Sequence, residues 1–177
     1  MESLIFLLTF LAALGSGVMA GLFFAFSAFI MTAFSRLPWA GGIAAMQSIN
    51  VAILNPVFFA VFFGTPAVCV SLAIAAVVRW PEPGSLSLLA GSLLHLLGSF
   101  VVTIAFNVPL NNRLAAVSAD SLEGAAVWTE YLSVWTAWNH VRTVACLVAT
   151  PCSSWRSGSL GRDGSRSEMN SLDVSMV

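Results

Sequence analysis

Apolar residues fill long stretches of this chain that contain no charged side chain. The uncharged stretches are residues 3–35, 37–78 and 84–112. Each is longer than the roughly 20 residues that an α-helix needs to cross a hydrocarbon core. Together with an apolar run near the C-terminus, they predict four membrane-spanning helices, at about 4–33, 55–78, 86–106 and 127–149.

The segment between the first two spans has a helical pattern of its own. Ile43, Met46, Gln47 and Asn50 fall near one face at helical spacing, and Asn55 is followed by a proline suited to a first helical turn. We predict a short helix at the non-cytoplasmic surface. Gln47 and Asn50 would face headgroups or contribute to a pocket, and Asn55 would cap the second span. The predicted fold is all-α: a four-helix transmembrane bundle with a short surface helix between spans 1 and 2.

Residues 1–150 form one predicted membrane domain, and the remainder differs in composition. Residues 151–177 are rich in Ser, Gly and Arg, and they predict a disordered cytoplasmic tail. Four spans place Arg79 and the arginines of the tail on one side, with Arg36 and Arg113 on the other. The positive-inside rule then predicts a multi-pass protein of the cell membrane with both termini in the cytoplasm.

Composition narrows the class of protein further. Hydrophobic residues make up 58% of the 177 and charged residues 8%, against about 25% in an ordinary soluble domain. There is no lysine and the net charge is −1, which argues against nucleic-acid binding. The three cysteines form no Cys-x-x-Cys, and no His/Glu/Asp cluster suggests protein-bound iron. We expect a bilayer-embedded protein without a metal or organic cofactor.

The fourth predicted span carries a stripe of aromatic and polar side chains. Six residues fall within about 100° on a helical wheel: Trp128, Tyr131, Trp135, Trp138, Asn139 and Arg142. His140 points to the opposite face. A guanidinium at the centre of a membrane helix costs roughly 2.5–3.5 kcal/mol, so such a residue usually faces the protein interior and marks a site. An interfacial aromatic belt explains Trp128 and Tyr131, whereas Trp135 and Trp138 lie deeper.

The third predicted span contains His95 near its middle and Pro109 near its end. Proline removes a backbone donor, so we expect the helix to kink or open there, with Asn107 and Asn111 available as partners. His95 would be either a hydrogen-bonded packing residue or an acid or base in a pocket.

Two further patterns concern packing. Gly17 and Gly21 belong to a ridge of small residues that predicts close helix contact, within the bundle or between subunits of a homo-oligomer. Phenylalanines crowd two regions and predict lipid and core contact, with an aromatic ligand site as the alternative: Phe23, Phe24, Phe26, Phe29, Phe58, Phe59, Phe62 and Phe63.

Several motifs, taken in order, carry a family resemblance. They are Gly17-x-x-x-Gly21-Leu-Phe-Phe-Ala-Phe-Ser27, Met46-Gln47-x-Ile-Asn50, Asn107-Val-Pro109-Leu-Asn111 and Trp135-x-x-Trp138-Asn139-x-x-Arg142-Thr143. The chain resembles the anthrone-oxygenase-like family of small four-helix membrane proteins over about residues 4–148. The resemblance implies a four-helix bundle and, as in some fungal members, oxidation of an anthrone by O2 without a recognised cofactor. The polar tail after Pro151 departs from the family, whose last helix continues with apolar residues.

An anthrone carries an acidic methylene, and its anion reacts with O2 when held in a dry pocket. Such a reaction needs donors for an oxyanion, a route for the proton and an aromatic-lined cavity. We assign Arg142 and Asn139 to the oxyanion and His95 or His140 to proton transfer. Trp135 and Trp138 would stack on the substrate, and Asn50, Asn107 and Asn111 would form the outer rim of a pocket between spans 3 and 4.

The competing hypothesis is a membrane module without catalytic activity, which binds a small hydrophobic ligand or a partner protein. Arg142 would then be neutralised within the structure, by Glu130 of another subunit or by backbone carbonyls.

Overall fold

The computed structural model describes the backbone of residues 2–174 and the side chains of residues 2–150. Within those limits every regular element is helical, so the all-α prediction is confirmed. The α-helices are α1 (Glu2–Ala25), α2 (Met31–Ser35), α3 (Trp39–Ala52), α4 (Pro56–Val78), α5 (Ser85–His95), α6 (Val108–Ala115) and α7 (Leu122–Val174). Three π-helical segments continue them: η1 (Phe26–Ile30), η2 (Leu96–Val101) and η3 (Thr103–Asn107).

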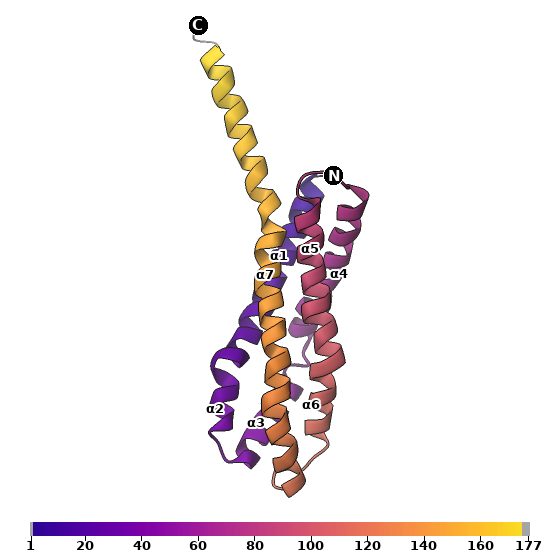
Figure 1. The fold of residues 1–177 in the computed structure, drawn as a ribbon, viewed down its shortest axis with the longest axis vertical. Coiled ribbons are helices and arrows are strands. Elements are labelled where there is room, and N and C mark those ends of the chain that lie inside the picture. The colour runs from indigo at the N-terminus through magenta and orange to yellow at the C-terminus, as the bar shows by residue number, and fades with distance from the viewer. Residues whose placement is uncertain (1, 175–177) are drawn as a thin grey trace.

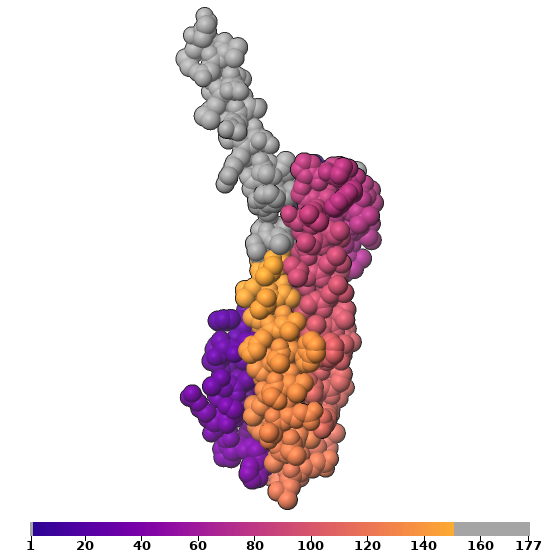
Figure 2. Space-filling view, viewed as in Figure 1, coloured from indigo at the N-terminus to yellow at the C-terminus, as the bar shows by residue number. Residues whose placement is uncertain are grey.

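The long helices lie side by side and alternate in direction (Figure 1). α1 and α5 each pack against both α4 and α7. The N-terminus and the α4–α5 turn lie at one end of the helix bundle, and the α2–α3 and α6–α7 connections lie at the other. Figure 2 shows one face of α7 exposed between the first helices of the chain and the α5–α6 stretch.

Three stretches are long and apolar enough to cross a membrane: Glu2–Ser35, Pro56–Val78 and Ser85–Ala115. They confirm the first three predicted spans. The fourth, 127–149, lies inside α7 and is helical, but the described part of α7 does not meet the same criterion of length and hydropathy. Glu130, Asn139, His140 and Arg142 fall within this predicted span and lower its mean hydropathy.

The predicted short helix between the first two spans is α3, and its packing explains two polar side chains. Gln47 of α3 donates from Nε2 to the carbonyls of Leu114 (2.9 Å) and Val117 (3.1 Å), so it ties α3 to the end of α6 rather than facing headgroups. Asn55 accepts from the Phe58 backbone N–H through Oδ1 at 3.0 Å, which confirms its predicted role as the N-cap of α4.

The predicted opening of the third span takes the form of π-helix. η2 and η3 together occupy most of the turns between His95 and Pro109, and Pro109 lies in the first turn of α6. π-Helical turns are rare, occur mostly as single-turn insertions and are frequent at functional sites. A further π segment, η1, interrupts the first span, where the sequence predicted an unbroken helix.

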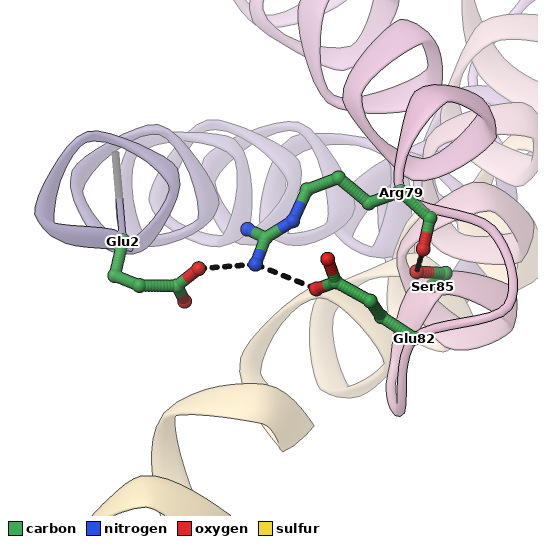
Figure 3. Close-up of polar contacts among 4 residues, drawn as sticks. All are labelled: Glu2, Arg79, Glu82 and Ser85. Atoms are coloured by element: carbon green, nitrogen blue, oxygen red, sulfur yellow. Dashed lines mark hydrogen bonds and ion pairs between the residues drawn. The ribbon is translucent and has the colours of Figure 1, made fainter.

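An ionic cluster joins the N-terminus to the α4–α5 turn (Figure 3). The Arg79 guanidinium contacts the carboxylates of both Glu2 and Glu82, the latter at 2.6 Å. These hydrogen bonds, to Glu82 and then to Glu2, raise the pKa of Arg79 above its ordinary value, so its charge is retained. Ser85 donates from Oγ to the Arg79 carbonyl at 3.2 Å and fixes the start of α5.

Gly17 and Gly21 face open space, because a methyl group added at either would meet no other atom of the described chain within 4 Å. Their predicted ridge therefore does not pack inside this chain, and the homo-oligomer contact stays a prediction. The disordered tail predicted for 151–177 lies outside the residues whose side chains are described, and it also stays a prediction.

Candidate functional site

A cavity of about 240 Å³ lies where α1, α3, α4, the η3–α6 stretch and α7 converge. Most of its wall is apolar, and six phenylalanines contribute to it: Phe23, Phe26, Phe58, Phe59, Phe62 and Phe63. Its polar wall consists of Asn50, Thr103, Asn111 and Arg142. The site is thus an aromatic chamber with a few polar groups, the usual composition of a small-molecule pocket.

Arg142 brings the one cationic side chain into this cavity wall. Its side chain is buried, with 4% of the residue exposed. Nη2 donates to Asn139 Oδ1 at 2.6 Å and Nη1 donates to Thr103 Oγ1 at 3.2 Å. The guanidinium carbon lies 4.2 Å from the centre of the Phe23 ring and 5.0 Å from that of Trp135. Two ring faces and two oxygens therefore hold the charge.

No carboxylate pairs with Arg142 in the described part of the chain, where the ion pairs involve Arg79 and Arg113. Glu130, which the competing hypothesis brings to Arg142 from another subunit, contacts Arg113 Nη1 of its own chain at 2.7 Å. The Arg142 Nε is buried and has no hydrogen-bond partner among the described residues. Positive charge and one unused donor are left beside the cavity.

Asn139 positions the arginine and does not line the cavity. It is fully buried and donates from Nδ2 to the Phe23 carbonyl (2.8 Å) and to Ser27 Oγ (2.7 Å). Both acceptors lie on the first span, where η1 begins. Because the amide nitrogen is occupied by these acceptors, Oδ1 faces Arg142. The predicted proximity of Asn139 to Arg142 is found, and its contact is with the arginine.

A second polar group lies at the other end of the cavity. Asn111 Oδ1 accepts from Tyr131 Oη at 2.7 Å and from Trp135 Nε1 at 2.8 Å. An indole N–H can only donate, so the amide oxygen must face Trp135. Trp128, Tyr131 and Trp135 stack in sequence along α7, with ring centres 5.7 and 5.6 Å apart. Trp135 and Asn111 both line the cavity, as predicted for substrate-binding residues.

Asn50 and Asn107 differ in position. Asn50 lines the cavity, and its side chain lies within reach of the Tyr131 side chain. Asn107 is buried beside the cavity wall and donates to the Trp135 carbonyl at 3.2 Å. It holds the backbone of α7 against η3 and is absent from the lining.

Three further predicted site residues, besides Asn139 and Asn107, are absent from the cavity lining. His95 is buried elsewhere, with Nδ1 3.0 Å from Ser16 Oγ and 4.0 Å from Cys146 Sγ. His140 is exposed on the outer face of α7. Trp138 stacks on Phe106, with ring centres 3.8 Å apart and planes inclined by 9°. Thus neither histidine is among the residues that line the cavity.

The cavity extends beyond the predicted pocket. We expected spans 3 and 4 to form it, and they supply six lining residues, two of them, Trp135 and Arg142, from α7, whereas the stretch from α1 to α4 supplies the rest. Thr103 is not among the predicted site residues, and the first expectation for the phenylalanines is contact with lipid and core. Six of those phenylalanines line the cavity, which agrees with the alternative prediction, an aromatic ligand site.

Among the described residues no three His, Cys, Asp or Glu side chains lie together in a way that could hold a metal ion.

Comparison with known proteins gives one match. The sequence profile of a family described as anthrone oxygenase matches residues 58–152, which is more than half of the chain and extends from α4 into α7. No curated protein and no solved structure matches.

Proposed function

Because the chain belongs to the anthrone oxygenase family, we propose that it is a four-span membrane protein that oxidises a small planar aromatic molecule with O2 in the cavity beside Arg142. The observation that carries this proposal is a buried guanidinium in an aromatic chamber, with no carboxylate paired to it among the described side chains.

The fourth span in this proposal is α7. It packs along α1 and α5, two of the candidate spans. Three of its polar residues face inward, because Asn139, Arg142 and Thr143 are buried, whereas His140 is exposed. The described part, 122–150, is about 40 Å long at 1.5 Å per residue, enough for a bilayer core of about 30 Å. A helix that is polar toward its neighbours can cross the membrane despite a low mean hydropathy.

The cavity walls suit a flat, apolar molecule with one polar edge. Phenylalanine rings and Trp135 offer contact surfaces for fused aromatic rings. Arg142 lies on the same wall, and its Nε has no hydrogen-bond partner among the described residues. A carbonyl or phenolate oxygen placed against this guanidinium would gain a charge-assisted hydrogen bond in a region that excludes water.

The proposed reaction starts from the hydroxyl tautomer of an anthrone. O2 adds to the electron-rich carbon opposite the hydroxyl group. The hydroxyl proton moves to the peroxide, and the oxygen of that hydroxyl group becomes a carbonyl oxygen. The hydroperoxide then loses water, which carries away the hydrogen of that carbon and leaves the second carbonyl. One anthrone and one O2 give one anthraquinone and one water.

In this scheme Arg142 stabilises negative charge on the substrate oxygen while electrons move to O2. Asn139 and Thr103 hold the guanidinium in place. Both proton acceptors in this scheme derive from O2: the peroxide receives the hydroxyl proton, and the hydroxide that departs from the hydroperoxide receives the proton of that carbon. This differs from our expectation for His95 and His140, which lie away from the cavity.

The test is consumption of emodin-anthrone by membranes that contain the protein. We expect the wild type to exceed the spontaneous rate, and Arg142→Lys to lower kcat by about 10²-fold, because lysine keeps the charge and loses the planar fork. Arg113→Lys is the matched control, since Arg113 pairs with Glu130 at the surface. Wild-type membranes that never exceed the spontaneous rate would refute the oxygenase.

A binding module without catalytic activity is the second candidate function. It is favoured by the lining of the cavity, where Arg142 is the one titratable side chain among the described residues. On that hypothesis, membranes would retain an anthraquinone without consuming an anthrone, and Arg142→Lys would weaken retention at unchanged folding.

A further inference from the structure

The cavity has a mouth whose exposed residues are all apolar. Five lining residues are exposed: Leu54, Phe59, Phe63, Ile104 and Val108. The polar lining residues are buried or half-buried, with Thr103 and Arg142 the most deeply buried of them. Polarity therefore increases from the outside of the cavity to its interior.

This mouth lies between α4 and the η3–α6 stretch. Phe59 and Phe63 come from α4, and Ile104 and Val108 come from the third span. α4 packs against α1, α5 and η2, but not closely against η3 or α6. Phe100 of η2 marks where the packing ends, with its ring centre 5.2 Å from Phe62 and 5.9 Å from Phe63. Beyond Phe100 the two helices leave the cavity uncovered.

Both sides of the mouth belong to candidate membrane spans, Pro56–Val78 and Ser85–Ala115. Phe63 is 52% exposed and Ile104 is 49% exposed. Large apolar side chains around an opening would be poorly solvated by water, whereas lipid chains cover them at no cost.

We propose that this mouth is a lateral portal to the bilayer, through which a lipid-soluble planar aromatic molecule reaches Arg142 without passing through water. The oxygen-bearing edge enters first and meets the guanidinium, and the apolar rings remain between the phenylalanines. This inference rests on the proposed function, which supplies the class of substrate. It implies that the width of the gap between α4 and the η3–α6 stretch determines how fast that substrate enters and leaves the cavity.

The test uses proteoliposomes and 1,8-dihydroxyanthraquinone, a lipid-soluble planar phenol. Ile104→Trp and Val108→Trp narrow the mouth from the third span. Val70→Trp on α4 and Leu97→Trp on η2 are the matched controls, because both positions are exposed and neither lines the cavity. Binding kinetics follow the quenching of tryptophan fluorescence in a stopped-flow instrument.

We expect the mouth variants to lower the association and dissociation rates together, by about 10-fold, with Kd nearly unchanged, and the controls to match the wild type. Phe63→Ala widens the mouth and should raise both rates. Equal rates in all variants would overturn the portal, and so would a wild type that does not bind the probe.

Emodin-anthrone consumption in the same vesicles separates the two proposals. Mouth-dependent binding without oxidation would refute the oxygenase and support the portal. Oxidation with binding rates that do not depend on the mouth would support the oxygenase and refute the portal.

Discussion

At the scale of single residues, Asn139 takes the position beside Arg142 that a carboxylate takes beside most buried cations. A carboxylate would neutralise the guanidinium and remove its attraction for an anionic ligand. The neutral amide accepts from Nη2 at 2.6 Å and leaves the positive charge in place. Two ring faces, of Phe23 and Trp135, add stabilisation without adding negative charge.

Removing that amide should destabilise the protein. In Asn139→Leu the Phe23 carbonyl and the Arg142 Nη2 lose their partner. Each buried polar group left unpaired costs about 1–3 kcal/mol, so we expect a loss of about 2–4 kcal/mol in the free energy of unfolding. The measurement is SDS-induced unfolding in mixed micelles. Asn112→Leu is the control, because Asn112 is exposed, and it should change the free energy by less than about 0.5 kcal/mol.

The two deep tryptophans of α7 should respond differently to the same change. Trp135→Phe removes the hydrogen bond from Nε1 to Asn111 Oδ1 and should cost about 1–2 kcal/mol. Trp138→Phe keeps a ring that can stack on Phe106 and should cost less than about 0.5 kcal/mol. The same unfolding measurement applies to both. Equal losses would show that the Asn111 hydrogen bond contributes nothing measurable.

At the scale of elements, the sequence predicted helices well and their irregularities poorly. Apolar stretches between charges placed the first three spans, because length and hydropathy alone decide whether a helix suits a membrane. The pattern of apolar and charged residues gives no indication of the π segment η1. Its neighbour Asn139 lies on α7, more than a hundred residues further along the chain, so no local periodicity reports the contact.

Close packing between η2 and α7 yields a prediction at one glycine. A methyl group added at Gly98 would lie 2.5 Å from the Ala145 Cβ, so Gly98→Ala should force the two helices apart and cost about 1–3 kcal/mol. The measurement is again unfolding in mixed micelles.

Gly17→Ala is the matched control for Gly98→Ala, because nothing lies within 4 Å of the added methyl group. It should be neutral or slightly stabilising, since alanine favours helix over glycine. A large loss in Gly17→Ala, accompanied by loss of an oligomer, would instead show that this face packs against a second copy of the chain.

At the scale of the whole molecule, the cavity draws on segments from residue 22 to residue 142. The sequence identified Arg142, Trp135, Asn50 and Asn111 by residue type and spacing, and all four line it. The helical wheel placed His140 on the face opposite Arg142, and His140 is exposed there. The sequence could not show that His95 lies elsewhere, because its placement depends on which face of α5 meets the neighbouring helices, and membrane helices offer little contrast between lipid-facing and protein-facing apolar residues.

The number of spans decides on which side of the membrane each end of the chain lies. The N-terminus and the α4–α5 turn share one end of the helix bundle, and the α2–α3 and α6–α7 connections share the other (Figure 1). If α7 crosses the membrane, a reporter placed after Thr150 must lie on the same side as one placed before Glu2.

The side of the membrane on which each end lies is measured with reporter fusions in a bacterial host. Green fluorescent protein and alkaline phosphatase are each fused at both positions. We expect fluorescence without phosphatase activity at both ends, because the Arg-rich tail favours the cytoplasm. Phosphatase fused after Leu37 or Ser118, in the opposite connections, should be active. Reporters that place the two ends on opposite sides would mean that α7 does not cross. In that case α7 would cover Arg142 against the other three spans without itself crossing the hydrocarbon core.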